Sequence, residues 1–183
     1  MTRDFFPKSR IVVVAAALTI LCGCPRPDRG LAPLETVNQV DLQRYLGTWY
    51  EIASYPTRFQ KGCVATRADY ALRPDGLIRV VNQCRKNALD GPLQSAEGKA
   101  RVVNPPANSR LEVCFFWPFW GDYWIIDLDA DYRWAVIGHP SRDYLWILSR
   151  TPTLDEALYR RLLKTLPARG YDPGRLQRTL QVR

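Results

Sequence analysis

The β-rich part of the chain opens with Leu46-Gly47-Thr48-Trp49-Tyr50-Glu51-Ile52-Ala53 and closes with Tyr144-Leu145-Trp146-Ile147-Leu148-Ser149-Arg150-Thr151-Pro152. Aromatic and β-branched residues of this kind favour strands. An aromatic residue near the start of the region, Trp49, and a cation near its end, Arg150, indicate a sheet that curls until its ends meet. Closure of this kind makes a barrel, and what fills its interior is the functional question.

Strand signals recur at short spacing between these two runs. The predicted strands are Gly47–Tyr55, Cys63–Leu72, Gly76–Cys84, Gln94–Asn104, Arg110–Trp117, Gly121–Leu128, Tyr132–Gly138 and Tyr144–Ser149. Turns such as Pro74-Asp75-Gly76 join strands that are neighbours in sequence, so an up-and-down meander is the simplest topology. Eight strands are enough to close around one small ligand.

One helix is predicted after the last strand. Thr153 and Glu156 have the spacing of a capping box. The leucines that follow form an apolar stripe at helical spacing, at Leu154, Leu158, Leu162, Leu163 and Leu166. This stripe needs an apolar partner outside the barrel. Leu145 and Ile147 of the last strand can supply it while Trp146 faces inward.

The meander also assigns the two ends of the barrel. The 73–76, 105–109 and 129–131 turns are expected at the closed end, together with the N-terminus, and the 56–62, 85–93, 118–120 and 139–143 loops at the open end. A helical turn at residues 41–45 would plug the base. The tail at 178–182 could add an edge strand.

The N-terminus reads as an export signal. A basic start is followed by the uncharged run Ile11–Leu21, which is too short to span a bilayer and suits a signal peptide. Leu21-Cys22-Gly23-Cys24 resembles a bacterial lipobox with Cys24 as the acylated residue; the alternative is an ordinary secreted protein. We therefore expect a signal peptide at 1–23, a lipidated tether at 24–37 and one folded domain at 38–183. The residue after Cys24 is Pro25 and not Asp, and resemblance to known sorting patterns therefore favours the outer membrane.

Three cysteines remain for other roles once Cys24 is acylated. Cys63 begins one predicted strand and Cys84 ends the next, so a hairpin with a bulge or slanted pairing brings them close together. Export to an oxidising compartment then favours a disulfide between them. Cys114 lies inside a predicted strand and is expected to be free and buried.

Composition argues against several classes of function. The net charge is +8, but the basic residues are dispersed, so no nucleic-acid interface is predicted. Attraction to an anionic lipid surface is the alternative. The single histidine, His139, falls in a predicted loop as a solvated turn residue. Metal-ligand spacing and phosphate loops are not found in the sequence, so we expect no metal, no cofactor and no catalytic residues.

Three short motifs resemble the conserved regions of the lipocalins: Gly47-x-Trp49, Gly121-Asp122-Tyr123 and Arg150. The resemblance covers residues 38–183. Within the family, the sequence is especially similar to the bacterial outer-membrane lipocalins, which are relatives of apolipoprotein D. It implies an all-β fold, an eight-stranded antiparallel up-and-down β-barrel with a C-terminal α-helix packed on the outside. It also implies that Gly47, Trp49 and Arg150 form a structural base.

The same resemblance implies a binding protein for fatty acids or lysophospholipids. Arg58 or Lys61 at the rim would meet an anionic head group, with Phe59 beside it. The wall residues expected from strand alternation are Val113, Phe115, Trp124, Ile126, Trp134, Val136, Tyr144 and Trp146. A slip of one residue would swap the faces of the fifth to seventh strands.

An aromatic run, Phe116-Trp117-Pro118-Phe119-Trp120, forms one lip of the predicted mouth. It could pack on the barrel rim, gate a ligand through Trp117 and Phe119, face a membrane, or bind a partner such as a second copy in a homodimer. A further alternative is an enzyme that acts on a bound lipid through Cys114, although no histidine stands beside it in sequence. A tetrapyrrole is an alternative ligand.

Overall fold

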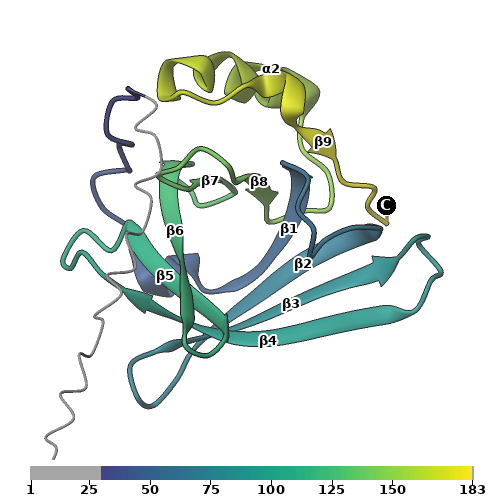
Figure 1. The fold of residues 1–183 in the computed structure, drawn as a ribbon, viewed down its shortest axis with the longest axis horizontal. Coiled ribbons are helices and arrows are strands. Elements are labelled where there is room, and N and C mark those ends of the chain that lie inside the picture. The colour runs from purple at the N-terminus through teal and green to yellow at the C-terminus, as the bar shows by residue number, and fades with distance from the viewer. Residues whose placement is uncertain (1–29, 183) are drawn as a thin grey trace, which may run out of the picture. The chain divides into compact units, whose positions relative to one another are not determined.

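A computed structural model describes residues 30–182, which form an antiparallel barrel (Figure 1). Its strands are β1 (Gly47–Ser54), β2 (Cys63–Leu72), β3 (Ile78–Lys86), β4 (Leu93–Val102), β5 (Arg110–Phe116), β6 (Phe119–Leu128), β7 (Trp134–Gly138) and β8 (Leu145–Ser149). Each strand pairs with the next along the chain, and β1 pairs with both β8 and β2, which closes the barrel. The predicted eight-stranded meander is confirmed, with strand ends shifted by one or two residues.

Helix α2 (Glu156–Thr165) follows β8, but the predicted cap was wrong. Asp155 caps the helix, because its carboxylate accepts a 2.8 Å hydrogen bond from the amide of Leu158. Thr153 lies before the helix, where its backbone carbonyl accepts a hydrogen bond from the hydroxyl of Thr151. Aspartate caps helices at least as well as threonine, so the helix begins after Asp155. The short helix α1 (Leu42–Tyr45) is the turn expected before β1.

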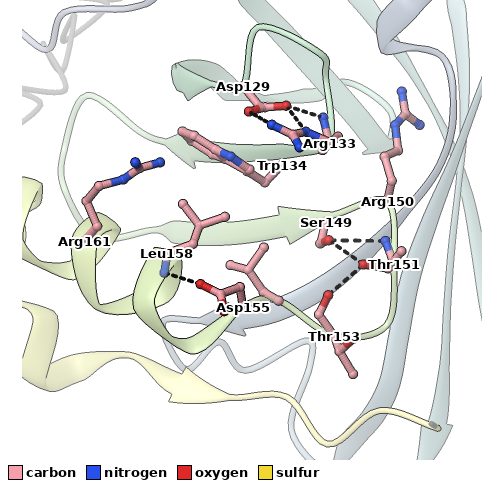
Figure 2. Close-up of a pocket in the computed structure, with 11 residues that line it drawn as sticks. Asp129, Arg133, Trp134, Ser149, Arg150, Thr151, Thr153, Asp155, Leu158 and Arg161 are labelled. Carbon is pink, nitrogen blue, oxygen red and sulfur yellow. Dashed lines mark hydrogen bonds and ion pairs between the residues drawn. The ribbon is translucent and has the colours of Figure 1, made fainter.

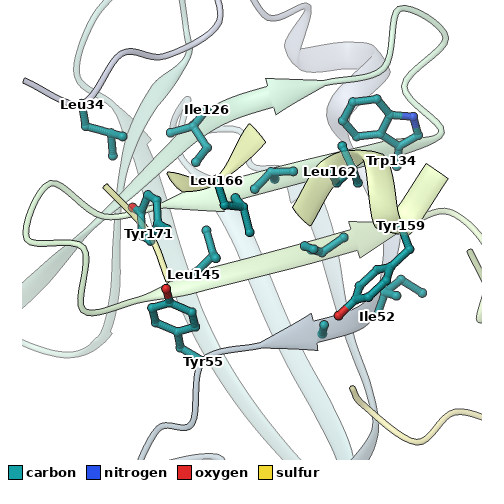
Figure 3. Packing of buried hydrophobic residues seen from close by; sticks show 13 residues of the cluster. Leu34, Ile52, Tyr55, Ile126, Trp134, Leu145, Tyr159, Leu162, Leu166 and Tyr171 are labelled. Atoms are coloured by element: carbon teal, nitrogen blue, oxygen red, sulfur yellow. The ribbon is translucent and has the colours of Figure 1, made fainter. Parts of the chain in front are cut away.

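Two apolar clusters lie on opposite faces of the wall formed by β6, β7 and β8. The outer cluster fills the space under α2, where Leu162 and Leu166 pack on Leu145 and Ile147 (Figure 3). The inner cluster is centred on Trp49 at the barrel base. Because both faces of this wall are covered, all five residues of β7 are buried.

The C-terminal tail completes the wall where β1 and β2 separate. The two strands pair only from Gly47 to Tyr50 on β1, and β9 (Gln177–Arg178) takes over as the partner of Ala53 and Ser54. Further on, the amide of Ala65 on β2 donates to the carbonyl of Leu180 at 2.6 Å. The tail thus adds the expected strand and also bridges to β2.

The described chain begins at the open end, which corrects the expected position beside the closed-end turns. The carbonyl of Ala32 accepts a 2.6 Å hydrogen bond from Arg142, in the β7–β8 loop. Leu34 then packs in the outer cluster, and the amide of Val40 bonds to the 103–109 connection at the closed end. Residues 31–37, which we assigned to a tether, therefore lie against the barrel. Within residues 30–182, no helix is long and apolar enough to cross a membrane.

Candidate ligand-binding site in the barrel

Arg150 and Trp49 hold the closed end of the barrel together. The guanidinium carbon of Arg150 lies 3.8 Å from the centre of the fully buried Trp49 ring. The guanidinium also donates to the carbonyl oxygens of Thr48 and Tyr45. Gly47 has a φ of +92°, which favours glycine, and a Cβ there would lie 3.4 Å from a guanidinium nitrogen of Arg150. These contacts make the group a structural base.

Three tyrosine hydroxyls meet inside the barrel next to this base. The Tyr123 oxygen lies 2.7 Å from that of Tyr45 and accepts from Tyr70 at 3.1 Å. Burial raises the pKa of all three phenols, and that of Tyr70 to about 12. All three are therefore neutral at physiological pH. They give the barrel a neutral, hydrogen-bonded floor.

Toward the open end, the apolar residues of the interior become partly exposed. Val113, Phe115 and Trp146 pack against the inner cluster without being fully buried. Gly98 makes room for one of them, because a Cβ there would lie 2.8 Å from the ring of Phe115. The ring of Tyr144 stacks on that of Trp146, with centroids 5.9 Å apart. This half of the interior is the candidate site for an apolar ligand.

Four of the expected wall residues face outward instead: Trp124, Ile126, Trp134 and Val136. The last three belong to the outer cluster under α2, where Figure 3 labels Ile126 and Trp134. Trp124 packs against this cluster. The interior positions of β6 and β7 are held by their neighbours Tyr123, Ile125, Ala135 and Ile137. The faces were misassigned because α2 makes the outer face as apolar as the inner one, so alternation of hydrophobicity is lost.

A polar network that was not predicted runs from the interior to the C-terminal tail. The indole N–H of Trp146 donates to Gln60 at 3.2 Å, and the Gln60 amide donates to the buried Glu51 carboxylate at 2.6 Å. The hydroxyl of Thr66 is buried without a hydrogen-bond partner among residues 30–182. Alternation from Ala68, which packs on the inner cluster, places Thr66 on the interior face. A polar residue at an inward strand position was the signal available in the sequence.

The expected rim residues do come to one end of the barrel. Phe59 is 69% exposed, Trp117 78% and Phe119 76%. Arg58 and Lys61, in the same loop as Phe59, are also exposed. The meander places these loops opposite the structural base, so the basic groups proposed for a head group stand at the mouth.

The cysteines pair as expected from the hairpin. Cys63 and Cys84 form a disulfide with their Cα atoms 5.4 Å apart, across the β2–β3 pair. Cys114 is free and buried on β5.

His139 is half-buried rather than solvated. Its Nδ1 atom lies 2.9 Å from the hydroxyl of Ser141 and accepts from the amide of the same residue. Its Nε2 atom lies 3.7 Å from the carboxylate of Asp122. The contacts between His139 and Ser141 join residues two apart and include the Ser141 backbone amide, so they stabilise the β7–β8 turn. Within residues 30–182, no cluster of His, Cys, Asp and Glu could hold a metal ion.

A separate pocket lies outside the barrel, between the closed-end connections and the first turns of α2 (Figure 2). Trp134, Leu154 and Leu158 line its apolar side. Its two carboxylates are already engaged, because Asp129 pairs with Arg133 and Asp155 caps α2. It is a groove between the helix and the wall, distinct from the interior.

Comparison with known proteins places this geometry in a family. Residues 40–181 match the model of the lipocalin-like domain. Outer membrane lipoprotein Blc of Escherichia coli (strain K12) is 44% identical over 158 residues, covering 86% of this chain and 87% of that protein. Temperature-induced lipocalin-1 of Arabidopsis thaliana is 43% identical over 157 residues, covering 81% and 83%. Apolipoprotein D of Macaca fascicularis is 35% identical over 150 residues, covering 77% of each chain.

Solved structures agree on the fold. Insecticyanin from the tobacco hornworm Manduca sexta superposes with a TM-score of 0.66, at 20% sequence identity, over 81% of this chain and 85% of its own. An identity this low speaks for the fold alone. The family match, the relatives and the closed barrel with its outer helix lead to one conclusion: the chain belongs to the lipocalin family.

Proposed function

We propose that this protein binds fatty acids or lysophospholipids inside its barrel and stores or transports them in the bacterial envelope. The observation that carries the proposal is the partly exposed apolar wall toward the mouth, formed by Val113, Phe115 and Trp146. Ligand pockets are typically apolar with a few polar groups that orient the ligand. Membership of the lipocalin family supports binding rather than catalysis, and buried Cys114 lacks a neighbouring base in sequence.

The barrel offers a different environment to each end of such a ligand. An acyl chain would run along Phe115 and Trp146 toward the tyrosine floor. An anionic head group would remain at the mouth, within reach of Arg58 or Lys61, both exposed. The unpartnered hydroxyl of Thr66 could accept or donate a hydrogen bond to a glycerol or ester group.

The anchor is the second part of the proposal. We infer that residues 1–23 are removed and that Cys24 is acylated at the periplasmic face of the outer membrane. Cys24 lies outside the described residues, so the support comes from the lipobox and from relatives. Proteins named outer membrane lipoprotein Blc are 44% identical in Escherichia coli and 35% identical in Vibrio cholerae. Mass spectrometry of the intact protein tests acylation, and Cys24→Ala should leave the membrane fraction.

A displacement titration tests ligand binding directly. Delipidated protein is loaded with a fluorescent fatty acid, and unlabelled fatty acid or lysophospholipid is added. We expect displacement at micromolar concentrations and a detectable acyl ligand in natively extracted protein. No binding of any acyl compound in that range would overturn the proposal.

A further inference from the structure

Five large apolar side chains are exposed on the strand ends and strand connections at the open end of the barrel. Together they form what we call the apolar rim: Phe59 (69% exposed), Leu93 (56%), Phe116 (78%), Trp117 (78%) and Phe119 (76%). Phe59 and Trp117 lie in the β1–β2 and β5–β6 connections, and the other three are the end residues of β4, β5 and β6. The meander brings these strand ends to the same end of the barrel. Large apolar side chains that are exposed at the same end of a protein mark a surface that contacts another body.

The charge around the apolar rim suits an anionic surface. Arg58 and Lys61 flank Phe59 in the β1–β2 loop, and the ammonium group of Lys86, at the end of β3, bonds to the carbonyl of Lys61. Asp90 is the acidic residue of the β3–β4 loop. Aromatic tips beside long basic side chains match a bilayer surface, where rings settle at the head-group level and cations meet phosphates.

The course of the N-terminal segment points to the same surface. Residues 31 and 32 lie at the open end, where the Ala32 carbonyl is bound by the buried Arg142. Cys24 precedes Leu31 by seven residues, and a fully extended stretch of that length reaches about 25 Å. An acyl chain on Cys24 would therefore hold the open end close to the membrane.

We propose that the apolar rim docks into the surface of the phospholipid bilayer that holds the anchor, so that the barrel opens toward the membrane. This inference rests on the acylation of Cys24 in the proposed function and adds an orientation and a docking surface. A lipid could then pass between the bilayer and the interior without crossing water.

Spin labelling of the full lipoprotein tests the orientation. A nitroxide is attached at Phe119→Cys or Leu93→Cys, and the protein is reconstituted into vesicles of phosphatidylethanolamine and phosphatidylglycerol. The introduced thiol is the reactive one, since Cys114 is buried and Cys63 and Cys84 are bonded. Collisions with oxygen are compared with collisions with a water-soluble nickel chelate. We expect the oxygen-to-nickel ratio to be several-fold higher in the rim than at the matched closed-end positions Leu72→Cys and Val103→Cys, also exposed apolar residues.

Two outcomes would overturn the docking proposal. Equal ratios at both ends would show that the rim stays in water although the protein is anchored. Spin–spin broadening between rim labels, with few collisions with either reagent, would show that a second copy covers the rim. Acyl binding is measured in the same samples by ligand titration. A rim that lies in the bilayer in a protein that binds no acyl ligand would contradict only the proposed function. Acyl binding by a protein whose rim stays in water would contradict only the docking.

Discussion

The hydroxyl of Thr179 donates a 2.5 Å hydrogen bond to the buried carboxylate of Glu51 and so ties the C-terminal tail to β1. The side-chain amide of Gln181 adds two more bonds, both at 2.8 Å, to the carbonyls of Glu51 and Thr66. These donors reach backbone groups at the point where β1 and β2 no longer pair with each other. The tail therefore closes the split between the first two strands.

Replacing Gln181 with alanine should weaken this closure. The substitution leaves two strand carbonyls without their donor, and we expect the free energy of unfolding to fall by about 1–3 kcal/mol. Urea denaturation followed by tryptophan fluorescence measures it. The matched control is Val182→Ala, since Val182 is 55% exposed and its loss should change stability by less than about 0.5 kcal/mol. Equal losses in the two variants would contradict the role of Gln181.

Glu51 should make stability depend on pH. Burial raises its pKa above the ordinary glutamate value of 4.5, although hydrogen bonds from Thr179, Gln60 and Ser54 act in the opposite direction. The folded state then binds more protons than the unfolded state, so its stabilising contribution is complete below pH 4.5 and is lost as the pH rises through the folded pKa.

Glu51→Gln cannot titrate, so its stability should change less between pH 4.5 and neutrality than that of the unaltered protein. Urea midpoints measured across that range provide the comparison. Glu35→Gln, at an exposed glutamate, is the control and should keep the original slope. If Glu51→Gln kept it too, the pH dependence would have to come from other groups.

The features that could be predicted from the sequence depend on local signals. The turn at Pro74-Asp75-Gly76 fixes the β2–β3 hairpin and so brings Cys63 near Cys84, although a register shift between Val64 and Arg67 lies between the turn and the disulfide. The strand count follows from similar signals, and the leucine stripe predicts an outer helix. The stack of Arg150 on Trp49 was expected only from the lipocalin resemblance, since nothing local links residues so far apart.

The features that escaped prediction depend on what covers each surface. On β6 and β7 both faces are apolar, so Ile126 and Trp134 looked as suitable for the interior as Ile125 and Ala135. A register shift between Ile125 and Asp127 further disturbs the alternation. The first described residues are held at the open end by the hydrogen bond from Arg142 to Ala32, which has no signature in the sequence.

Arg150 should contribute to stability without contributing to ligand affinity. Arg150→Ala removes the contact with Trp49 and leaves the buried carbonyl of Tyr45 with fewer donors. We expect a loss of roughly 1.5–3 kcal/mol in urea denaturation, with the fatty-acid affinity of the folded protein unchanged. Arg150→Lys should recover only part of the loss, because an ammonium group lacks the planar fork of donors. Arg161→Ala, at an exposed arginine on α2, should be neutral. A weakened ligand affinity in Arg150→Ala would instead place this residue in the binding site.

Substitutions on the two faces of the β6–β8 wall should have different effects: those on the outer face should lower stability, and those on the inner face should weaken ligand binding. Trp134 is 8% exposed and packs under α2, so Trp134→Ala should cost about 3–5 kcal/mol of stability and leave ligand affinity intact. Trp146 is partly exposed and lies on the interior face with Phe115. Trp146→Ala should therefore cost less stability but weaken acyl binding about tenfold or more, since a lost aromatic contact removes roughly 1.5–3 kcal/mol.

The comparison is made by displacement titration of both variants at a temperature where each is fully folded. Phe115→Ala is a second interior variant and should behave like Trp146→Ala, because Phe115 packs against the same inner cluster. If Trp134→Ala weakened acyl binding as much as the two interior variants, the ligand would have to contact the outer face. A lipid held between α2 and the wall would then replace a lipid held in the barrel.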